Sequence, residues 1–214
     1  MNDSDPVLIP SSLMARAKAI LLTPREEWPR IAAEPATIGS LYTGWVVILA
    51  AIPAICGLIG ALLFGYSMMG ISYRPSAGAA ISTALVGYVL SLVQVYVLAL
   101  IIDALAPTFA GTRDRVQAFK LAAYAATAGW VGGLFQILPA IAPLGMIAAL
   151  YSIYLLYVGL PLLMRAPQEK AVGYTVVTII AAILIGIATM MIAGPIAGLF
   201  GGPMNPAGGG MMPG

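Results

Sequence analysis

Long apolar stretches with almost no charge follow one another along most of this chain. A helix needs about 20 apolar residues to cross the ~30 Å hydrocarbon core of a membrane. Five stretches reach that length, and only short links separate them. The sequence therefore predicts an all-α, polytopic membrane protein with five transmembrane helices. The predicted spans are residues 38–66, 78–105, 118–138, 141–164 and 173–200.

The composition also indicates that most of the protein's surface faces lipid. Hydrophobic residues make up 61% of the 214 positions and charged residues only 8%, whereas a soluble domain has about 25% charged residues. A soluble chain of this length would need more charge to cover its surface. The few basic residues form no clustered basic face, which excludes a nucleic-acid-binding surface.

The positions of the basic residues predict how the spans are oriented. Lys and Arg gather in the cytoplasmic links of membrane proteins. With a cytoplasmic N-terminus, nine of the ten basic residues lie inside and only Arg74 lies outside. The opposite orientation would reverse these numbers, so we expect a cytoplasmic N-terminus and an extracytoplasmic C-terminus. The basic residues on the predicted inner side are Arg16, Lys18, Arg25, Arg30, Arg113, Arg115, Lys120, Arg165 and Lys170.

The chain divides into three parts on this basis. Residues 1–37 form a leader, which we expect to hold an amphipathic helix in the cytoplasm or at the membrane interface. Residues 38–200 form the five-span membrane domain. Residues 201–214 are rich in Gly, Pro and Met, a low-complexity composition that predicts a disordered tail.

Within the leader, residues 11–22 carry an apolar stripe at helical spacing, with Arg16 and Lys18 off the stripe. Such a helix can lie among lipid headgroups with its basic side chains against anionic lipid. It can equally be a solvated leader that only orients the first span. A second helix is predicted to begin at Pro24, with Thr23 as its cap and Glu26 reaching back.

The residues that normally carry catalysis are missing. The sequence has no histidine, and its one cysteine, Cys56, lies in an apolar stretch. A disulfide within the chain and a zinc site built from paired cysteines are therefore excluded. No glycine-rich phosphate loop, no serine paired with a base and no carboxylate pair is visible. We expect no cofactor, no metal site and no enzymatic activity.

One weakly polar stripe runs along the second predicted span. Thr83, Ser91 and Gln94 lie at helical spacing, and Asp103 stands near the cytoplasmic end of the same span. Such a stripe can face other helices and hydrogen-bond to them, or it can line a narrow pore. Asp103 lies off the stripe, which argues against a simple ion conduit, and from its position it can reach water or meet Arg113 and Arg115.

Several segments of the sequence resemble bacterial Yip-type (Ypt-interacting protein) membrane domains, over residues 13–195. This resemblance implies a five-helix bundle with a cytoplasmic N-terminus in the bacterial inner membrane. Eukaryotic members bind Rab-type GTPases, but the long acidic N-terminal region of many of them is absent here, so a GTPase partner is not supported. The segments are AILLTPREEW (19–28), IAAEP (31–35), VQAFKLAAYA (116–125), WVGG (130–133), LYSIYLLYVGLP (150–161), MRAPQEKA (164–171) and GYT (173–175).

These observations lead to two hypotheses of different class. The first is a non-enzymatic inner-membrane protein that scaffolds or stabilises membrane partners, either another membrane protein or copies of itself. The second is a small transporter or channel that uses the stripe from Thr83 to Gln94 and helix kinks at Pro53 and Pro195. For the first, the candidate contact residues are Arg25, Glu26, Trp28, Arg30, Arg113, Arg115, Lys120, Arg165, Glu169 and Lys170.

Overall fold

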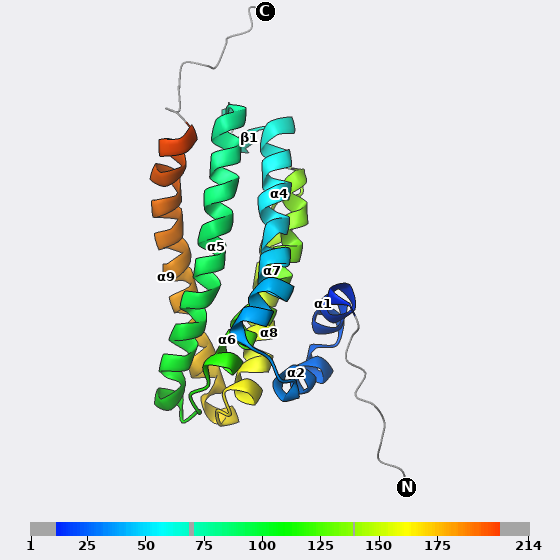
Figure 1. Ribbon diagram of the computed structural model, residues 1–214, viewed down its shortest axis with the longest axis vertical. Coiled ribbons are helices and arrows are strands. Elements are labelled where there is room, and N and C mark those ends of the chain that lie inside the picture. The colour runs from blue at the N-terminus through cyan, green and yellow to red at the C-terminus, as the bar shows by residue number, and fades with distance from the viewer. Residues whose placement is uncertain (1–11, 69–70, 139, 202–214) are drawn as a thin grey trace, which may run out of the picture.

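A computed structural model of the protein describes residues 12–68, 71–138 and 140–201. Over these residues it is an elongated bundle of helices with one short β-hairpin (Figure 1). Gly201 ends the last helix, so the rest of the tail predicted for 201–214 lies outside the described residues.

The chain order of the elements begins with two short leader helices and ends with the longest helix. The elements are α1 (Leu13–Leu22), α2 (Pro24–Ala33), α3 (Ile38–Leu41), the π-helical turn η1 (Tyr42–Val46), α4 (Val47–Leu63), β1 (Tyr66–Met68), β2 (Ile71–Tyr73), α5 (Ala77–Leu105), η2 (Ala106–Phe109), α6 (Arg115–Ala125), α7 (Thr127–Gly132), η3 (Gly133–Ile137), α8 (Leu144–Leu163) and α9 (Gln168–Gly201).

Four helices in the described part are long and apolar enough to cross a membrane. They correspond to the first, second, fourth and fifth predicted spans, which confirms the helical membrane architecture. Pro53 and Pro195 lie inside α4 and α9 without ending them. The four helices cover Ile38–Leu63, Ala77–Phe109, Leu144–Leu163 and Gln168–Leu199.

The third predicted span, residues 118–138, is not one continuous helix. It is divided into α6, α7 and the 3-10 segment η3, which together run upward through the bundle in Figure 1. Every residue from Ala118 to Ala125 is buried, so this part of the segment lies within the bundle. A Cβ atom added at Gly133 would lie 2.6 Å from Pro53 Cβ on α4, so only glycine permits this approach. Five crossings therefore stay a prediction.

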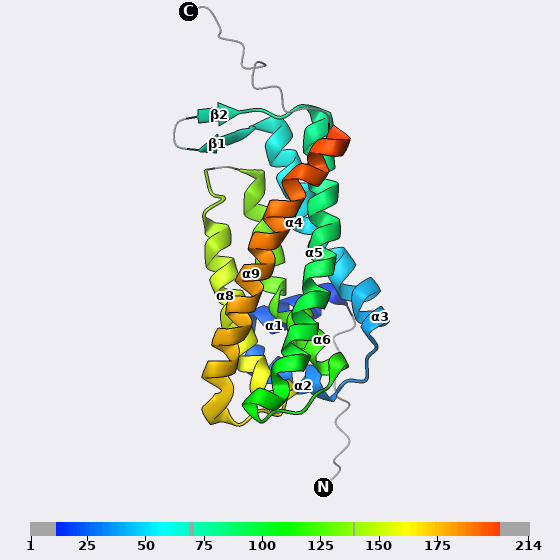
Figure 2. The ribbon, with the colours of Figure 1, turned by 90° about the vertical axis from the view of Figure 1, so that its left-hand side faces the viewer.

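The two longest helices, α5 and α9, pack side by side and antiparallel along the bundle (Figure 2). Near one end, the Ser82 hydroxyl donates a hydrogen bond of 3.0 Å to the Ala197 carbonyl. Near the other end, the Tyr174 hydroxyl donates to the Ile102 carbonyl. The hydrocarbon of a membrane holds no water that could pair with a hydroxyl, so a hydrogen bond to a backbone carbonyl lowers the free energy of the hydroxyl there. These contacts fix the relative height of the two helices.

A β-hairpin joins α4 to α5, which the prediction of an all-α chain did not include. Its strands pair antiparallel, with Tyr66 opposite Tyr73 and Met68 opposite Ile71. The hairpin lies at the end of the bundle away from α2 (Figure 2). Gly65, at φ 73°, provides the left-handed backbone conformation with which the chain leaves α4.

The leader forms the two predicted helices, α1 and α2, and both lie against the side of the bundle (Figure 1). The Ser12 side chain caps α1 by accepting a hydrogen bond from the Ala15 amide. Thr23 occupies the predicted N-cap position of α2, but its side chain makes no capping hydrogen bond, because its hydroxyl donates to the Ala19 carbonyl of the preceding helix. Pro24 is the first residue of α2, as expected.

Candidate interaction surface at the charged end

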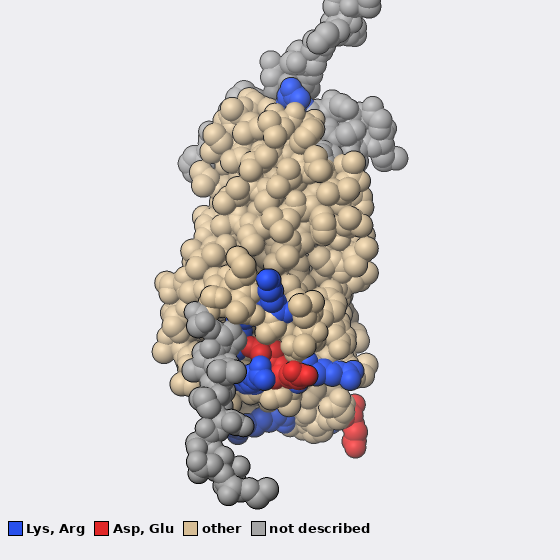
Figure 3. All heavy atoms as spheres, turned by 90° about the vertical axis from the view of Figure 1, so that its right-hand side faces the viewer, with Lys and Arg blue, Asp and Glu red and all other residues tan. Residues whose placement is uncertain are grey.

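Charged side chains gather at one end of the bundle (Figure 3). This charged end comprises α1, α2, the link from α5 to α6 and the link from α8 to α9. Arg74, beside the hairpin at the opposite end, is the exception among the ten basic residues, and it donates to the Leu63 carbonyl at 2.8 Å. The charged end is therefore the region where a polar partner or a lipid headgroup would meet the protein.

A buried ion-pair cluster holds the two leader helices together. The Arg16 guanidinium on α1 donates to the Glu27 carboxylate on α2 at 2.7 Å and to the Glu34 carboxylate at 2.5 Å. Glu27 is fully buried, and Arg16 is 6% exposed. Arg30 lies 3.3 Å from the second oxygen of Glu27 but is about half exposed, so water weakens this third contact.

This cluster corrects the orientation predicted for α1. The sequence predicts Arg16 off the apolar stripe, whereas it faces the same side as Ala17 and Ile20, which are buried. An arginine can occupy that side because another helix supplies carboxylates there. Lys18, by contrast, is exposed. Removing one partner of a buried ion pair costs about 3–5 kcal/mol, since the remaining charge stays buried without compensation.

Lys120 and Gln117, both on α6, bind the end of α2. The Lys120 ammonium donates to the Ile31 carbonyl at 2.8 Å and to the Glu34 carbonyl at 2.6 Å. The Gln117 amide donates to the Ala32 carbonyl at 3.0 Å. The last carbonyls of a helix have no partner within the helix and carry partial negative charge. A buried ammonium is thus stabilised, and the leader is fixed to α6.

Aromatic side chains complete the attachment. Trp28 on α2 is fully buried, and a Cβ atom added at Gly159 of α8 would lie 2.6 Å from its ring. Its ring meets that of Tyr124 edge-on at 6.4 Å. The Tyr151 hydroxyl on α8 donates to the Leu21 carbonyl at the end of α1 at 2.7 Å. The leader is consequently part of the folded bundle.

Two of the ten predicted contact residues are buried and not exposed. Trp28 and Lys120 are buried, at 0% and 2% exposure, so neither side chain can reach a partner while the leader stays in place. The eight others are exposed at the charged end, and we call them the exposed charged set. They are Arg25, Glu26, Arg30, Arg113, Arg115, Arg165, Glu169 and Lys170.

The structure joins the two links that carry Arg113 and Arg165. The Thr112 amide, in the link from α5 to α6, donates to the Met164 carbonyl at the end of α8 at 2.8 Å. Arg165 follows in the left-handed conformation, with φ 51°, and turns the chain toward α9. Arg113 and Arg165, far apart in sequence, are therefore carried on neighbouring links of one surface.

Asp103 connects this surface to the membrane helices. Its carboxylate lies 3.9 Å from the Arg115 side chain, the partner that its position in the sequence allowed. Asp103 is 12% exposed but Arg115 is 73% exposed, so solvent weakens the attraction. The other carboxylate oxygen is buried without a hydrogen-bond partner in the described structure. Asp103 thus belongs to the charged end and not to an intramembrane path.

The rest of the polar stripe lines two cavities beside α5. Gln94 and Ser91 line a cavity of about 420 Å³ among α5, α6, α7, α8 and α9, which we call the inner cavity. Thr83 and Ser91 line a second cavity of about 270 Å³ between α4 and α5. Asp103 lines neither of them. In the described part of the chain, no three His, Cys, Asp or Glu side chains come close enough to hold a metal ion.

The buried cluster predicts a strong contrast between two adjacent glutamates. Glu27→Ala should lower the free energy of unfolding by about 3–5 kcal/mol, because Arg16 remains buried without its main partner. Glu26→Ala, the matched control at an exposed position, should change it by less than ~0.5 kcal/mol. Equilibrium unfolding in detergent micelles measures both. Equal effects of the two substitutions would show that the cluster does not hold the leader.

Comparison with known proteins agrees with this architecture. Residues 18–190, from within α1 into α9, match the Yip1 domain family. The chain is similar to the inner membrane protein YohC of Escherichia coli K12, with 27% identity over 176 residues that cover 80% of this chain and 90% of that protein. YohC of Escherichia coli O6:H1 is similar to the same extent. No solved structure matches the chain at a significant level. The family match covers most of the chain and confirms the resemblance seen in its motifs: this membrane protein belongs to the Yip1 domain family.

Proposed function

We propose that this protein is a non-enzymatic protein of the bacterial inner membrane that scaffolds or stabilises membrane partners through the exposed charged set. The observation that carries the proposal is the division of charge at one end of the bundle. Arg16, Glu27 and Lys120 are buried and hold the leader, whereas the exposed charged set points away from the bundle. The backbone that carries these charges is already held in the fold, so binding would have to order the side chains only.

The exposed charges are available to a partner. Arg25, Arg113 and Arg165 form no ion pair with another described residue. Their positions on α2 and on the two joined links place positive charge on three separate elements of the charged end. A partner with acidic side chains beside its own membrane segment would be attracted to this arrangement. A second copy of the chain could supply such side chains through Glu26 and Glu169.

The orientation of the bundle is part of the proposal. Nine of the ten basic residues lie at the charged end, which we place in the cytoplasm. The leader is at this end and the end of α9 is at the other, as five crossings require (Figure 1). The similarity to an inner membrane protein supports placement in the bacterial inner membrane.

Cysteine labelling tests this orientation. In a Cys56→Ala background, Ser76→Cys at the hairpin end should react with a membrane-impermeant maleimide added to intact spheroplasts. Glu169→Cys at the charged end should react only after the membrane is opened. Both positions are exposed in the fold, so accessibility depends on the side of the membrane. Labelling of Glu169→Cys in intact spheroplasts would reverse the proposed orientation.

Charge reversal tests the scaffolding role. Arg113→Glu combined with Arg165→Glu should remove most of the protein that co-purifies from native membranes in mild detergent, because the basic links would then repel an acidic partner. The thermal midpoint should stay near that of the unmodified protein, since both side chains are exposed. Arg74→Glu, at the opposite end, is the control and should retain the partner. Co-purification that survives the double substitution would exclude these links as the contact.

A second candidate function has one specific observation in its favour. Ser91 lines both cavities beside α5, so the polar stripe passes from one cavity to the other. A transporter would use these cavities as parts of a path. In proteoliposomes, Ser91→Leu should then reduce the flux of small solutes about tenfold or more, whereas Val89→Leu on an exposed side of the same helix should not. Equal flux in vesicles with and without the protein would exclude this function.

A further inference from the structure

The inner cavity is a mostly apolar space among the helices of the bundle. Its walls come from α5, α6, α7, α8 and α9, and its volume is about 420 Å³. Small residues of α6 and α7 leave the space open, including Ala122, Ala125 and Gly129. Leu98, Leu156 and Ile179 form its apolar part. A cavity of this size and lining matches the common form of small-molecule sites.

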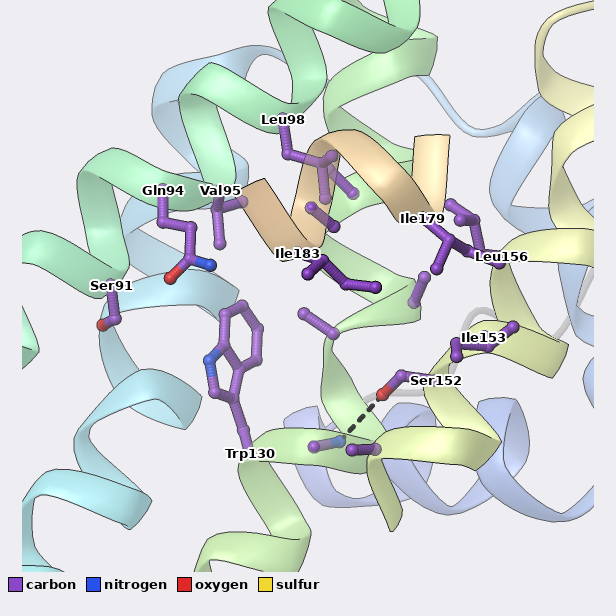
Figure 4. A pocket seen from close by; sticks show the side chains of 16 residues that line it. Ser91, Gln94, Val95, Leu98, Trp130, Ser152, Ile153, Leu156, Ile179 and Ile183 are labelled. Atoms are coloured by element: carbon purple, nitrogen blue, oxygen red, sulfur yellow. Dashed lines mark hydrogen bonds between the residues drawn. The ribbon is translucent and has the colours of Figure 1, made fainter. Parts of the chain in front are cut away.

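The side chains of Gln94 and Trp130 line the inner cavity and form no hydrogen bond with another described residue. Figure 4 shows the Gln94 amide directed toward the indole of Trp130. The two serines of the cavity differ, since Ser91 donates to the Tyr88 carbonyl and Ser152 accepts from the Gly129 amide. An unpaired amide or indole N–H away from water costs free energy that a ligand acceptor would recover.

The inner cavity opens sideways toward lipid. Ile153 on α8 and Ile183 on α9 both line it, yet they are 36% and 56% exposed on the outer surface of the bundle. The two helices run side by side, so the opening lies between them (Figure 2). A ligand can therefore enter from the bilayer without crossing the charged end.

The depth of Gln94 restricts the head group of such a ligand. Gln94 precedes Asp103 by nine residues on α5, which places it about 13 Å from the charged end at 1.5 Å per residue. A charged head group would lose its hydration at that depth, and no charged side chain lines the cavity to compensate. A neutral carbonyl can reach this depth and accept hydrogen bonds there.

We propose that the inner cavity binds a neutral lipophile that carries a carbonyl group. The carbonyl accepts hydrogen bonds from the Gln94 amide and the Trp130 indole, and the apolar body lies against Leu98, Leu156 and Ile179. This inference is independent of the proposed scaffolding role, because it uses a different part of the molecule. The carbonyl can belong to a quinone-type ring or to the ester of a membrane lipid, and these two sources are distinguished below.

Trp130 provides the signal for the test. A decyl-substituted benzoquinone, added to the full chain in lipid nanodiscs, should quench part of the tryptophan fluorescence along a saturable curve. Trp130→Phe should remove that saturable part, because Trp28 and Trp45 do not line the cavity. Gln94→Leu should weaken binding about tenfold, as expected for the loss of one well-placed hydrogen bond. Quenching that rises linearly without saturation, or equal affinity in Gln94→Leu, would overturn the proposal.

Two further variants separate binding in the inner cavity from general effects. Gln136→Leu makes the same chemical change in the second cavity and should bind the quinone like the unmodified protein. Ala182→Phe should fill the inner cavity from α9 and abolish saturable quenching while the protein stays monodisperse. Loss of binding in Gln136→Leu, or its persistence in Ala182→Phe, would place the probe elsewhere and overturn the site.

Brominated lipids identify the source of the carbonyl. Nanodiscs made with phospholipid brominated along its acyl chains should quench Trp130 before the quinone is added if the cavity holds lipid ester groups. Ala182→Phe should then remove that bromine quenching, because it fills the cavity, and the quinone should add less quenching than it does in unbrominated nanodiscs. Bromine quenching that is retained in Ala182→Phe would show that lipid reaches Trp130 only from outside the cavity, and it would exclude the lipid ester.

Discussion

The buried contact between the Arg16 guanidinium and the Glu27 carboxylate is the interaction on which the charged end depends. α1 and α2 are each only ten residues long, and helices of that length are marginal in isolation. Tertiary contacts must therefore hold them. Arg16 joins α1 to α2, and Lys120 joins the end of α2 to α6. Without the ion pair, Glu27 and Arg16 would each be a buried charge without compensation, which would weaken the attachment of the leader to the bundle.

This arrangement gives the basic residues of one protein two different roles. The positive charge near the membrane, which orients a polytopic protein, is usually treated as a property of links alone. Here Arg16 and Lys120 are among the nine basic residues of the charged end, and they also form the buried contacts that hold the leader. Arg113 and Arg165 lie on links joined by the Thr112–Met164 hydrogen bond and stay exposed. The exposed basic residues are therefore carried by a frame that buried basic residues help to hold together.

Much of the fold could be predicted from the sequence, and the failures have particular causes. Hydropathy located the four long helices because each must present apolar surface to lipid along its length. It could not show that residues 118–138 break into three segments or that their first part, 118–133, is mostly buried, although Gly129, Gly132 and Gly133 were a signal. It also could not place Lys120, since the Ile31 carbonyl that binds it is 89 residues away in sequence. The apolar stripe of α1 likewise could not reveal Arg16 on the buried side, because its partners belong to α2 and the segment after it.

The broken third segment also explains why the inner cavity exists. A continuous helix with large side chains would fill the space between α5 and α8, as a close-packed interior requires. Ala122, Ala125 and Gly129 are instead small enough for α6 and α7 to lie inside the bundle, and they leave the space beside Gln94 unfilled. Gly133, at the end of this segment, permits its contact with Pro53. The same small residues that bring this segment inside the bundle thus leave an apolar space. It contains the side chains of Gln94 and Trp130 and lies away from the charged end.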